Sequence, residues 1–145
     1  MKKISRRKFM NYAGVSFLAA LVAPVVAFFY PKNLESVPSE PVLVGPPEEL
    51  PVGTSKTIPF GRDPALVINT SEGLRAYSAV CTHFACLVKY DAENDEIACP
   101  CHEGYFDSLD GSVKSGPPPR ALDTYSAYIA EDGQIYVSAE TEETS

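Results

Sequence analysis

The chain has 145 residues and a formal net charge of -7 at neutral pH, and 45% of its residues are hydrophobic. This length allows one domain with a core of modest size. All charged residues up to position 32 are Lys or Arg, whereas the rest of the chain carries 6 basic against 19 acidic residues, a net charge of -13. Such an acidic domain argues against a nucleic-acid partner.

Residues 1–30 predict a twin-arginine export signal followed by a transmembrane anchor. The segment Ser5-Arg6-Arg7-Lys8-Phe9-Met10 has the twin-arginine pattern. The 21 residues from Met10 to Tyr30 carry no charge, and a helix of that length extends about 30 Å, the thickness of the hydrocarbon layer. The basic residues ahead of it predict a single pass through the cytoplasmic (inner) membrane, with the N-terminus in the cytoplasm and the C-terminal domain on the periplasmic side.

A cleavable signal peptide is the alternative for the same segment. Val25-Val26-Ala27 offers small residues of the kind that a cleavage site requires. The length of the uncharged run favours a retained anchor.

Residues 31–51 contain six prolines and no apolar periodicity, which is typical of an extended, polyproline-like linker. Part of this segment is expected to pack on the domain or on a partner. A spacer and a hinge for a moving head have similar compositions, so both interpretations stay open.

Residues 52–139 read as an all-β domain built from small antiparallel sheets. Short apolar runs alternate with turn residues, and no persuasive helical repeat follows position 31. The expected strands are Lys56–Phe60, Ala65–Asn69, Leu74–Val80, Leu87–Tyr90, Glu96–Ala98, Tyr105–Ser108, Tyr125–Ala130 and Gln134–Ser138. Turns are expected at Asn69–Gly73, Asp110–Gly111 and Glu131–Gly133. The acidic tail 140–145 is predicted to be disordered.

All cysteines and histidines of the chain lie in two short segments. The first box is Cys81-Thr82-His83-Phe84-Ala85-Cys86, and the second box is Cys99-Pro100-Cys101-His102. Thiolate and neutral imidazole are ligands for soft and borderline metals, and they recur here as Cys-x-His and Cys-x-x-His. The two boxes therefore predict a metal site.

The two boxes resemble those of the Rieske iron-sulfur proteins, in which two histidines replace two thiolates on one iron of a 2Fe-2S cluster. The resemblance implies that Cys81 and Cys99 hold the inner iron and that His83 and His102 hold the outer iron. It also implies a disulfide between Cys86 and Cys101. The implied fold is a Rieske-type antiparallel β-sandwich head, with cluster-binding loops at its tip, on one N-terminal transmembrane helix.

Two other interpretations of the boxes explain fewer of their residues. A tetrahedral structural zinc at Cys81, His83, Cys99 and His102 satisfies simple ligand counting, but Cys-x-His is not a common zinc spacing and the remaining two cysteines stay unexplained. A domain stapled by disulfides alone leaves the histidines without a role.

The segment Gly116-Pro117-Pro118-Pro119-Arg120, here called the proline loop, resembles the family's third wall around the cluster. Proline fixes φ and removes backbone donors, which suits a rigid apolar cover. Without the boxes, the same run reads as a rigid turn between strands.

After the second box the family usually has Gly-Ser-x-Tyr, whereas this chain has Glu103-Gly104-Tyr105-Phe106. Two hydroxyl donors to the cluster sulfurs are thus absent at the matching positions, and a carboxylate is added at Glu103. All three changes at Glu103, Gly104 and Phe106 are expected to lower the reduction potential, because they favour the less negative, oxidised cluster. Ala85, where glycine is usual, is expected to leave ligation intact.

The resemblance implies an electron-transfer subunit of a membrane quinol:cytochrome c oxidoreductase, not catalytic alone. The lowered potential expected from the departures after the second box suits menaquinol rather than ubiquinol. The implied partners are a cytochrome b subunit and a c-type cytochrome, with His102 as the quinol contact and proton acceptor. Export of a folded protein by the twin-arginine route suits a cluster that is assembled in the cytoplasm. The alternative is the small Rieske subunit of an arsenite oxidase-type molybdenum enzyme.

Overall fold

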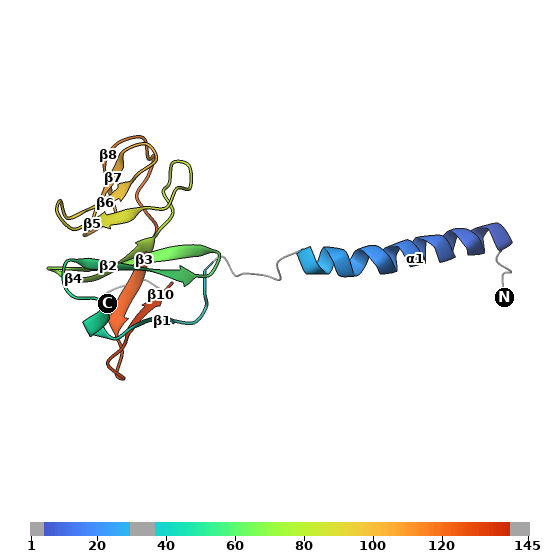
Figure 1. Cartoon of the computed structure of the whole chain (residues 1–145), viewed down its shortest axis with the longest axis horizontal. Coiled ribbons are helices and arrows are strands. Elements are labelled where there is room, and N and C mark those ends of the chain that lie inside the picture. Colours follow the sequence, from blue (N-terminus) through green and yellow to red (C-terminus); the bar gives the residue numbers. More distant parts are fainter. Residues whose placement is uncertain (1–4, 30–36, 140–145) are drawn as a thin grey trace, which may run out of the picture. The chain divides into compact units, whose positions relative to one another are not determined.

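The computed structural model describes residues 5–29 and 37–139 and divides the chain into two units, Met1–Leu34 and Glu35–Ser145 (Figure 1). The expectations for residues 1–4 and residue 30 of the signal and anchor, for residues 31–36 of the linker and for the tail 140–145 lie outside the described residues.

The first unit contains one helix, α1, which runs from Arg6 to Phe29 and includes Pro24. Ser5 precedes it, and its Oγ accepts a hydrogen bond from the backbone N–H of Lys8 at 3.4 Å, the bond that an N-cap residue makes. Large apolar side chains along α1 are exposed: Met10, Tyr12, Val15, Phe17, Leu18, Leu21, Val22, Val25 and Val26. Within the described residues, no helix combines the length and the hydropathy that a membrane span needs.

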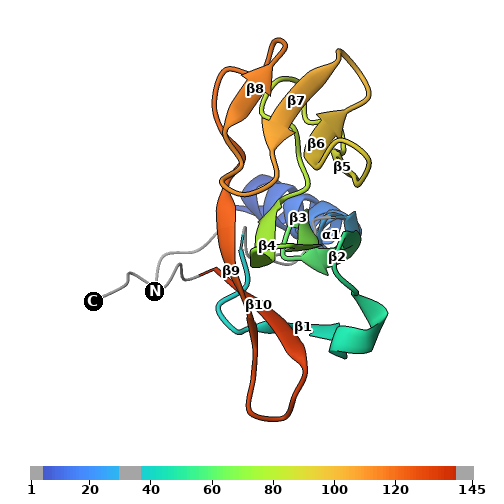
Figure 2. The ribbon, with the colours of Figure 1, turned by 90° about the vertical axis from the view of Figure 1, so that its left-hand side faces the viewer.

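The second unit, the head, consists of two antiparallel sheets (Figure 2). The larger sheet has six strands in the order β1-β10-β9-β4-β3-β2. Its strands are β1 (Val42–Gly45), β2 (Thr54–Phe60), β3 (Asp63–Thr70), β4 (Gly73–Ser78), β9 (Thr124–Ile129) and β10 (Ile135–Ser138). A short 3-10 helix, η1 (Pro47–Glu49), lies between β1 and β2.

The smaller sheet has four strands in the order β5-β6-β7-β8. Its strands are β5 (Lys89–Asp91), β6 (Glu96–Cys99), β7 (Gly104–Asp107) and β8 (Val113–Ser115). Consecutive strands pair as hairpins, so the end of β6 and the start of β7 meet at Cys99 and Gly104. The four-stranded sheet stands at one end of the head in Figure 2. The predicted antiparallel, all-β head is confirmed.

Two strands lie where none was expected. β1 falls in the segment expected to be an extended linker, and this segment buries Val44 and Leu50 in the head. Its three apolar residues lie between prolines, so the sequence pattern is too short to indicate a strand. The strand forms because it pairs with β10, which supplies the hydrogen bonds. β8 has a single apolar residue, Val113, and forms because β7 offers it an edge to pair with.

Strand β3 belongs to two cores at once. Its residues Ala65–Ile68 are all buried, as expected for a continuous apolar run covered on both faces. Ala65 and Val67 join a core with Phe60, Ile135 and others, whereas Leu66 and Ile68 join a core that continues toward the four-stranded sheet. Because side chains alternate along a strand, β3 connects the two halves of the head.

Hydrogen bonds also fix the loop after β7 to β4. The Tyr77 hydroxyl donates to the carbonyl oxygen of Ser108 at 2.9 Å, and Arg75 Nε donates to that of Leu109 at 3.1 Å. Burial is the main cause that raises the pKa of Tyr77 above its ordinary value, so its hydroxyl stays a donor at neutral pH. The four-stranded sheet is thereby held in a defined position relative to the six-stranded one.

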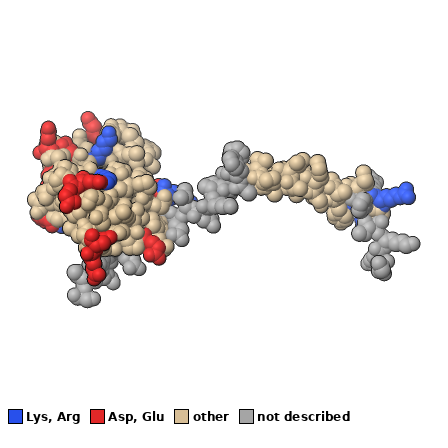
Figure 3. Space-filling view, turned by 60° about the horizontal axis from the view of Figure 1, so that its bottom comes forward, with Lys and Arg blue, Asp and Glu red and all other residues tan. Residues whose placement is uncertain are grey.

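The charges of the two units differ as the sequence predicted. Acidic side chains are spread over the head face seen in Figure 3, whereas the described charges at the start of α1 are basic. The described head, residues 37–139, contains 6 basic and 15 acidic residues, a net charge of -9.

Candidate metal centre

The first box forms a tight loop between β4 and β5. The backbone N–H of Cys81 donates to the carbonyl oxygen of Cys86 at 2.8 Å, and the N–H of Ala85 donates back to the carbonyl oxygen of Cys81 at 3.0 Å. Ala85 has φ of 55°, the left-handed conformation that glycine adopts without cost. The glycine that is usual at this position therefore has a backbone reason, and this chain keeps the conformation with alanine.

The second box forms the hairpin loop between β6 and β7. Cys99 is the last residue of β6 and pairs with Gly104, the first residue of β7. Glu103 closes the loop with φ of 52°, which again is the conformation that the usual glycine favours. The side chain of Glu103 is exposed.

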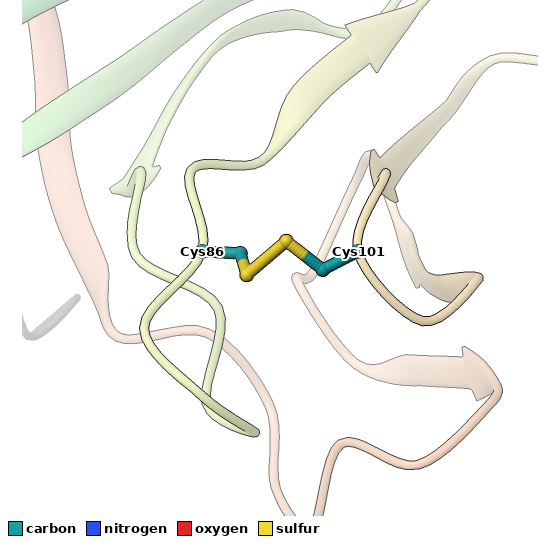
Figure 4. Close-up of a disulfide and its surroundings, with 2 residues drawn as sticks. All are labelled: Cys86 and Cys101. Atoms are coloured by element: carbon teal, nitrogen blue, oxygen red, sulfur yellow. A yellow bond between two sulfur atoms is a disulfide. The ribbon is translucent and has the colours of Figure 1, made fainter.

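A disulfide joins the two boxes. Figure 4 shows Cys86 reaching from the loop of the first box to Cys101 in the loop of the second. The Cα atoms of the pair are 6.5 Å apart, which lies within the range of protein disulfides. The predicted disulfide is therefore present, and it ties together loops that are 15 positions apart in sequence.

The proline loop packs against the second box. Pro118 is buried, whereas Gly116, Pro117 and Pro119 are exposed. A Cβ added at Gly104 would lie 2.7 Å from Pro118 Cγ, and one added at Gly116 would lie 2.5 Å from the carbonyl oxygen of Glu103. Both glycines are thus required for the close approach of the two loops.

Thr82 links the first box to the same loop, since its Oγ1 donates to the carbonyl oxygen of Arg120 at 2.7 Å. Sequence reasoning gave Thr82 no role, although the residue stands inside the Cys-Thr-His motif. The contact joins residues 38 positions apart, so only the folded structure could show it.

The two remaining cysteines, Cys81 and Cys99, are free and buried, with 3% and 4% of their surfaces exposed. Burial raises the pKa of the Cys81 thiol, and the backbone N–H groups of His83 and Phe84 oppose that shift by donating to its sulfur. Those N–H groups are well placed to stabilise a thiolate bound to a metal. The sulfur atoms of Cys86, Cys99 and Cys101 also lie within 4.8 Å of one another, but two of them are in the disulfide and are not free to bind a metal.

The two imidazoles stand side by side with different exposure. The ring centroids of His83 and His102 are 5.0 Å apart, and the rings are nearly perpendicular, at 84°. His83 is half-buried and His102 is exposed. The ring of Phe84, itself 71% exposed, lies 4.1 Å from the ring of His83.

One buried nitrogen tests whether these residues suit a cluster. Nδ1 of His83 is buried and has no hydrogen-bond partner within the described chain. An unpartnered buried polar atom is costly, and a metal bond is one way to satisfy it. Two buried free thiols and two neighbouring imidazoles form a donor set whose chemistry fits an iron-sulfur cluster with mixed sulfur and nitrogen ligation.

These features define a class of protein, a small β domain whose loops hold a redox-active metal cluster. Residues 40–126 match the model of the Rieske [2Fe-2S] domain family. The chain is 38% identical to the cytochrome b6-f complex iron-sulfur subunit of Chlorobaculum tepidum, over 91% of this chain and 72% of that protein. It is 31% identical to the corresponding subunit of Synechococcus elongatus, over 96% of this chain and 87% of that protein.

Among solved structures, the head resembles the ferredoxin of carbazole 1,9a-dioxygenase from Nocardioides aromaticivorans, with a TM-score of 0.60 and 26% identity over 70% of this chain and 100% of that one. The cyanobacterial plasma membrane Rieske protein from Synechocystis gives a TM-score of 0.53 and 30% identity, over 59% of this chain and 86% of that one. The chain belongs to the Rieske [2Fe-2S] family and, within it, to the iron-sulfur subunits of cytochrome bc-type complexes. Its cofactor is a Rieske 2Fe-2S cluster.

Proposed function

We propose that Cys81 and Cys99 hold the inner iron of the cluster and that His83 and His102 hold the outer iron. Three observations support this assignment. The two thiols are buried and outside the disulfide. The imidazoles are adjacent, and Nδ1 of His83 lacks a hydrogen-bond partner among the described residues.

The function that follows is electron transfer in a membrane quinol:cytochrome c oxidoreductase. When bound, the cluster supplies a one-electron acceptor. The exposed ring of His102 accepts a hydrogen bond from the quinol hydroxyl and takes its proton, while Pro118 and the disulfide keep the sulfur side covered. The carrying observation is the contrast between buried thiols and an exposed imidazole. A cytochrome b subunit is the proposed site of quinol binding, and a c-type cytochrome is the proposed acceptor of the electron.

Replacement of His102 tests this role. His102→Cys leaves a ligand for iron but removes the imidazole at the surface. We expect quinol-driven reduction of the c-type cytochrome in membranes to fall about 100-fold or more, the size of a lost acid-base group. His83→Cys is the matched control, because it makes the same ligand change at the half-buried ring and should leave a higher rate. Equal rates in the two variants, with clusters present in both, would refute the role of His102.

The quinol is proposed to be menaquinol, because the site lacks the two hydroxyl donors that raise the potential. Gly104 cannot simply be replaced by serine, since its Cβ would meet Pro118 Cγ at 2.7 Å. Phe106 is fully buried in the same core as Cys81 and Cys99, so a hydroxyl added there enters the surroundings of the thiolates. The potential is expected in the lower part of the range from about -150 to +300 mV that Rieske centres span.

Phe106→Tyr tests this part of the proposal. The added phenol should raise the midpoint potential, because a hydrogen bond to a cluster sulfur favours the reduced, more negative state. A potentiometric titration monitored by electron paramagnetic resonance measures it, with Phe60→Tyr in the other core as the matched control. A wild-type midpoint near the top of the range, or an unchanged midpoint in Phe106→Tyr, would contradict the proposal.

We propose that α1 anchors the protein in the membrane. The proposal is supported by the exposed apolar side chains of α1 and by the absence of charge from Met10 to Phe29 in the sequence, because a helix that is apolar all round is buried in protein or in lipid. The proposed topology has a cytoplasmic N-terminus and a periplasmic head. Protease added to spheroplasts should then digest the head, and alkaline carbonate should leave the chain with the membrane. A protected head or a chain released by carbonate would refute this topology.

A further inference from the structure

The free thiol of Cys99 lies beside the disulfide that joins the two boxes. Its Sγ lies within 4.8 Å of both sulfur atoms of the Cys86–Cys101 bond. Cys99 is the last residue of β6, and Cys101 follows it in the same loop. The fold thus places the Cys99 thiol next to the Cys86–Cys101 disulfide, and thiolates break disulfides by attacking one of the two sulfur atoms.

We infer that, in the chain without its cluster, Cys99 is an intramolecular nucleophile that opens the Cys86–Cys101 disulfide. In the exchange, Cys99 Sγ forms a new bond to Cys86 Sγ while the bond from Cys86 to Cys101 breaks. Cys101 leaves as a thiolate and takes up the proton that Cys99 lost. One disulfide and one thiol are present before and after, so the step needs no oxidant or reductant.

Burial favours this internal reaction over reaction with outside thiols. Cys99 has 4% of its surface exposed, and Cys81 has 3%, so dissolved reagents reach neither thiol easily. A neighbouring sulfur held by the fold needs no access from solvent and benefits from a high effective concentration. The product Cys86–Cys99 still joins the two loops, and it avoids the small ring that a bond from Cys99 to Cys101 across Pro100 would create.

Cys81 provides an internal comparison. It is also free and buried, and its thiol interacts with that of Cys99. However, Cys81 is not part of the group of three sulfur atoms that lie within 4.8 Å of one another. Geometry therefore distinguishes the two thiols, although both have the same proposed role toward iron.

The consequence concerns assembly. If the chain forms its disulfide before it receives iron, the exchange can place Cys99 in a disulfide with Cys86. Cys99 is then no longer a free thiol that can bind iron beside Cys81. A cluster bound through Cys99 blocks the exchange. This consequence rests on the proposed ligand role of Cys99, whereas the exchange itself does not depend on that role.

Differential alkylation of the full chain tests the inference. Cluster-containing protein in detergent is stripped of iron anaerobically with a chelator and incubated without added thiol. It is then denatured in acid, and free thiols receive a light label. After reduction, the former disulfide thiols receive a heavy label, and fragmentation mass spectrometry reads the label at each cysteine. Circular dichroism on the stripped sample confirms that the head is still folded.

We expect a measurable fraction of the stripped molecules to carry the heavy label on Cys99, with an equal gain of light label on Cys101. Cys81→Ser should keep this exchange, whereas Cys99→Ser should show heavy label on Cys86 and Cys101 alone. Protein that retains its cluster should also keep the original pairing. If Cys86 and Cys101 remain fully paired in folded, stripped wild-type protein, the inference is wrong. That result would leave the proposed electron-transfer function untouched, since the function is measured on cluster-containing protein.

Discussion

The two halves of the head reach stability in different ways. The six-stranded half has strands of seven and eight residues in β2 and β3, and its hydrophobic core contains aliphatic side chains and aromatic rings but no cysteine. The four-stranded half has strands of three or four residues, and its core includes the thiols Cys81 and Cys99. Short strands bury little apolar surface, so this half depends more on its cross-links.

The difference shows that one half of the head provides stability through apolar packing, whereas the loops of the other half carry the functional site. Apolar packing around β3 provides a rigid base, and Tyr77 and Arg75 attach the loop after β7 to it. The loops at the other end of the small sheet carry the cysteines and histidines of the two boxes. The disulfide and the proline loop replace the packing that these loops lack.

Truncation of one core residue in each half is expected to give the largest effect. Ile97→Ala and Ile135→Ala each remove a fully buried side chain, at a cost of about 2–5 kcal/mol in the free energy of unfolding. Only Ile97 shares a core with the thiols, so only Ile97→Ala should also speed the loss of cluster absorbance on incubation with a chelator. Similar rates of cluster loss in the two variants would show that both cores contribute equally to retention of the cluster.

Gly104→Ala is expected to have an intermediate effect, confined to the four-stranded half. The new Cβ would lie 2.7 Å from Pro118 Cγ, and overpacking of this kind costs about 1–3 kcal/mol. The double variant with Pro118→Ala should recover part of the loss, as a double-mutant cycle in chemical denaturation measures. Additive losses would mean that the contact between second box and proline loop does not limit stability.

The smallest effect is expected at the two left-handed residues of the boxes. Ala85→Gly and Glu103→Gly relieve φ values of 55° and 52°, so each should stabilise the protein by about 1 kcal/mol in thermal unfolding. Ala121→Gly, at an exposed position without positive φ, is the control and should destabilise it. A loss of stability in both box variants would show that the side chains matter more than the backbone conformation.

The sequence predicted the strands that bury regular apolar patterns and missed those that depend on a neighbour. The run at β3 and the turns at Asn69–Gly73 and Glu131–Gly133 were sufficient signals. β1 and β8 have too few apolar residues to be recognised, and they form because β10 and β7 offer open edges. Length and apolar pattern identify a strand only where the strand's own side chains are buried in a core.

The site was predictable to the extent that its chemistry lies in residue types. Six cysteines and histidines in two boxes indicated a metal centre, and the disulfide of Cys86 and Cys101 was implied by the family resemblance. The hydrogen bond from Thr82 to Arg120 and the contact of Gly104 with Pro118 join segments far apart in the chain. No local pattern encodes such contacts, so they required the structure.

Two thiolates and two imidazoles are proposed to hold the cluster at the tip of the four-stranded half. Electron-nuclear double resonance of the dithionite-reduced full chain, labelled with ¹⁵N-histidine, tests this ligand set. We expect two strongly coupled histidine nitrogens in the wild type and the loss of one in His83→Cys. A spectrum without coupled histidine nitrogen, or a purified protein without iron and acid-labile sulfide, would contradict it.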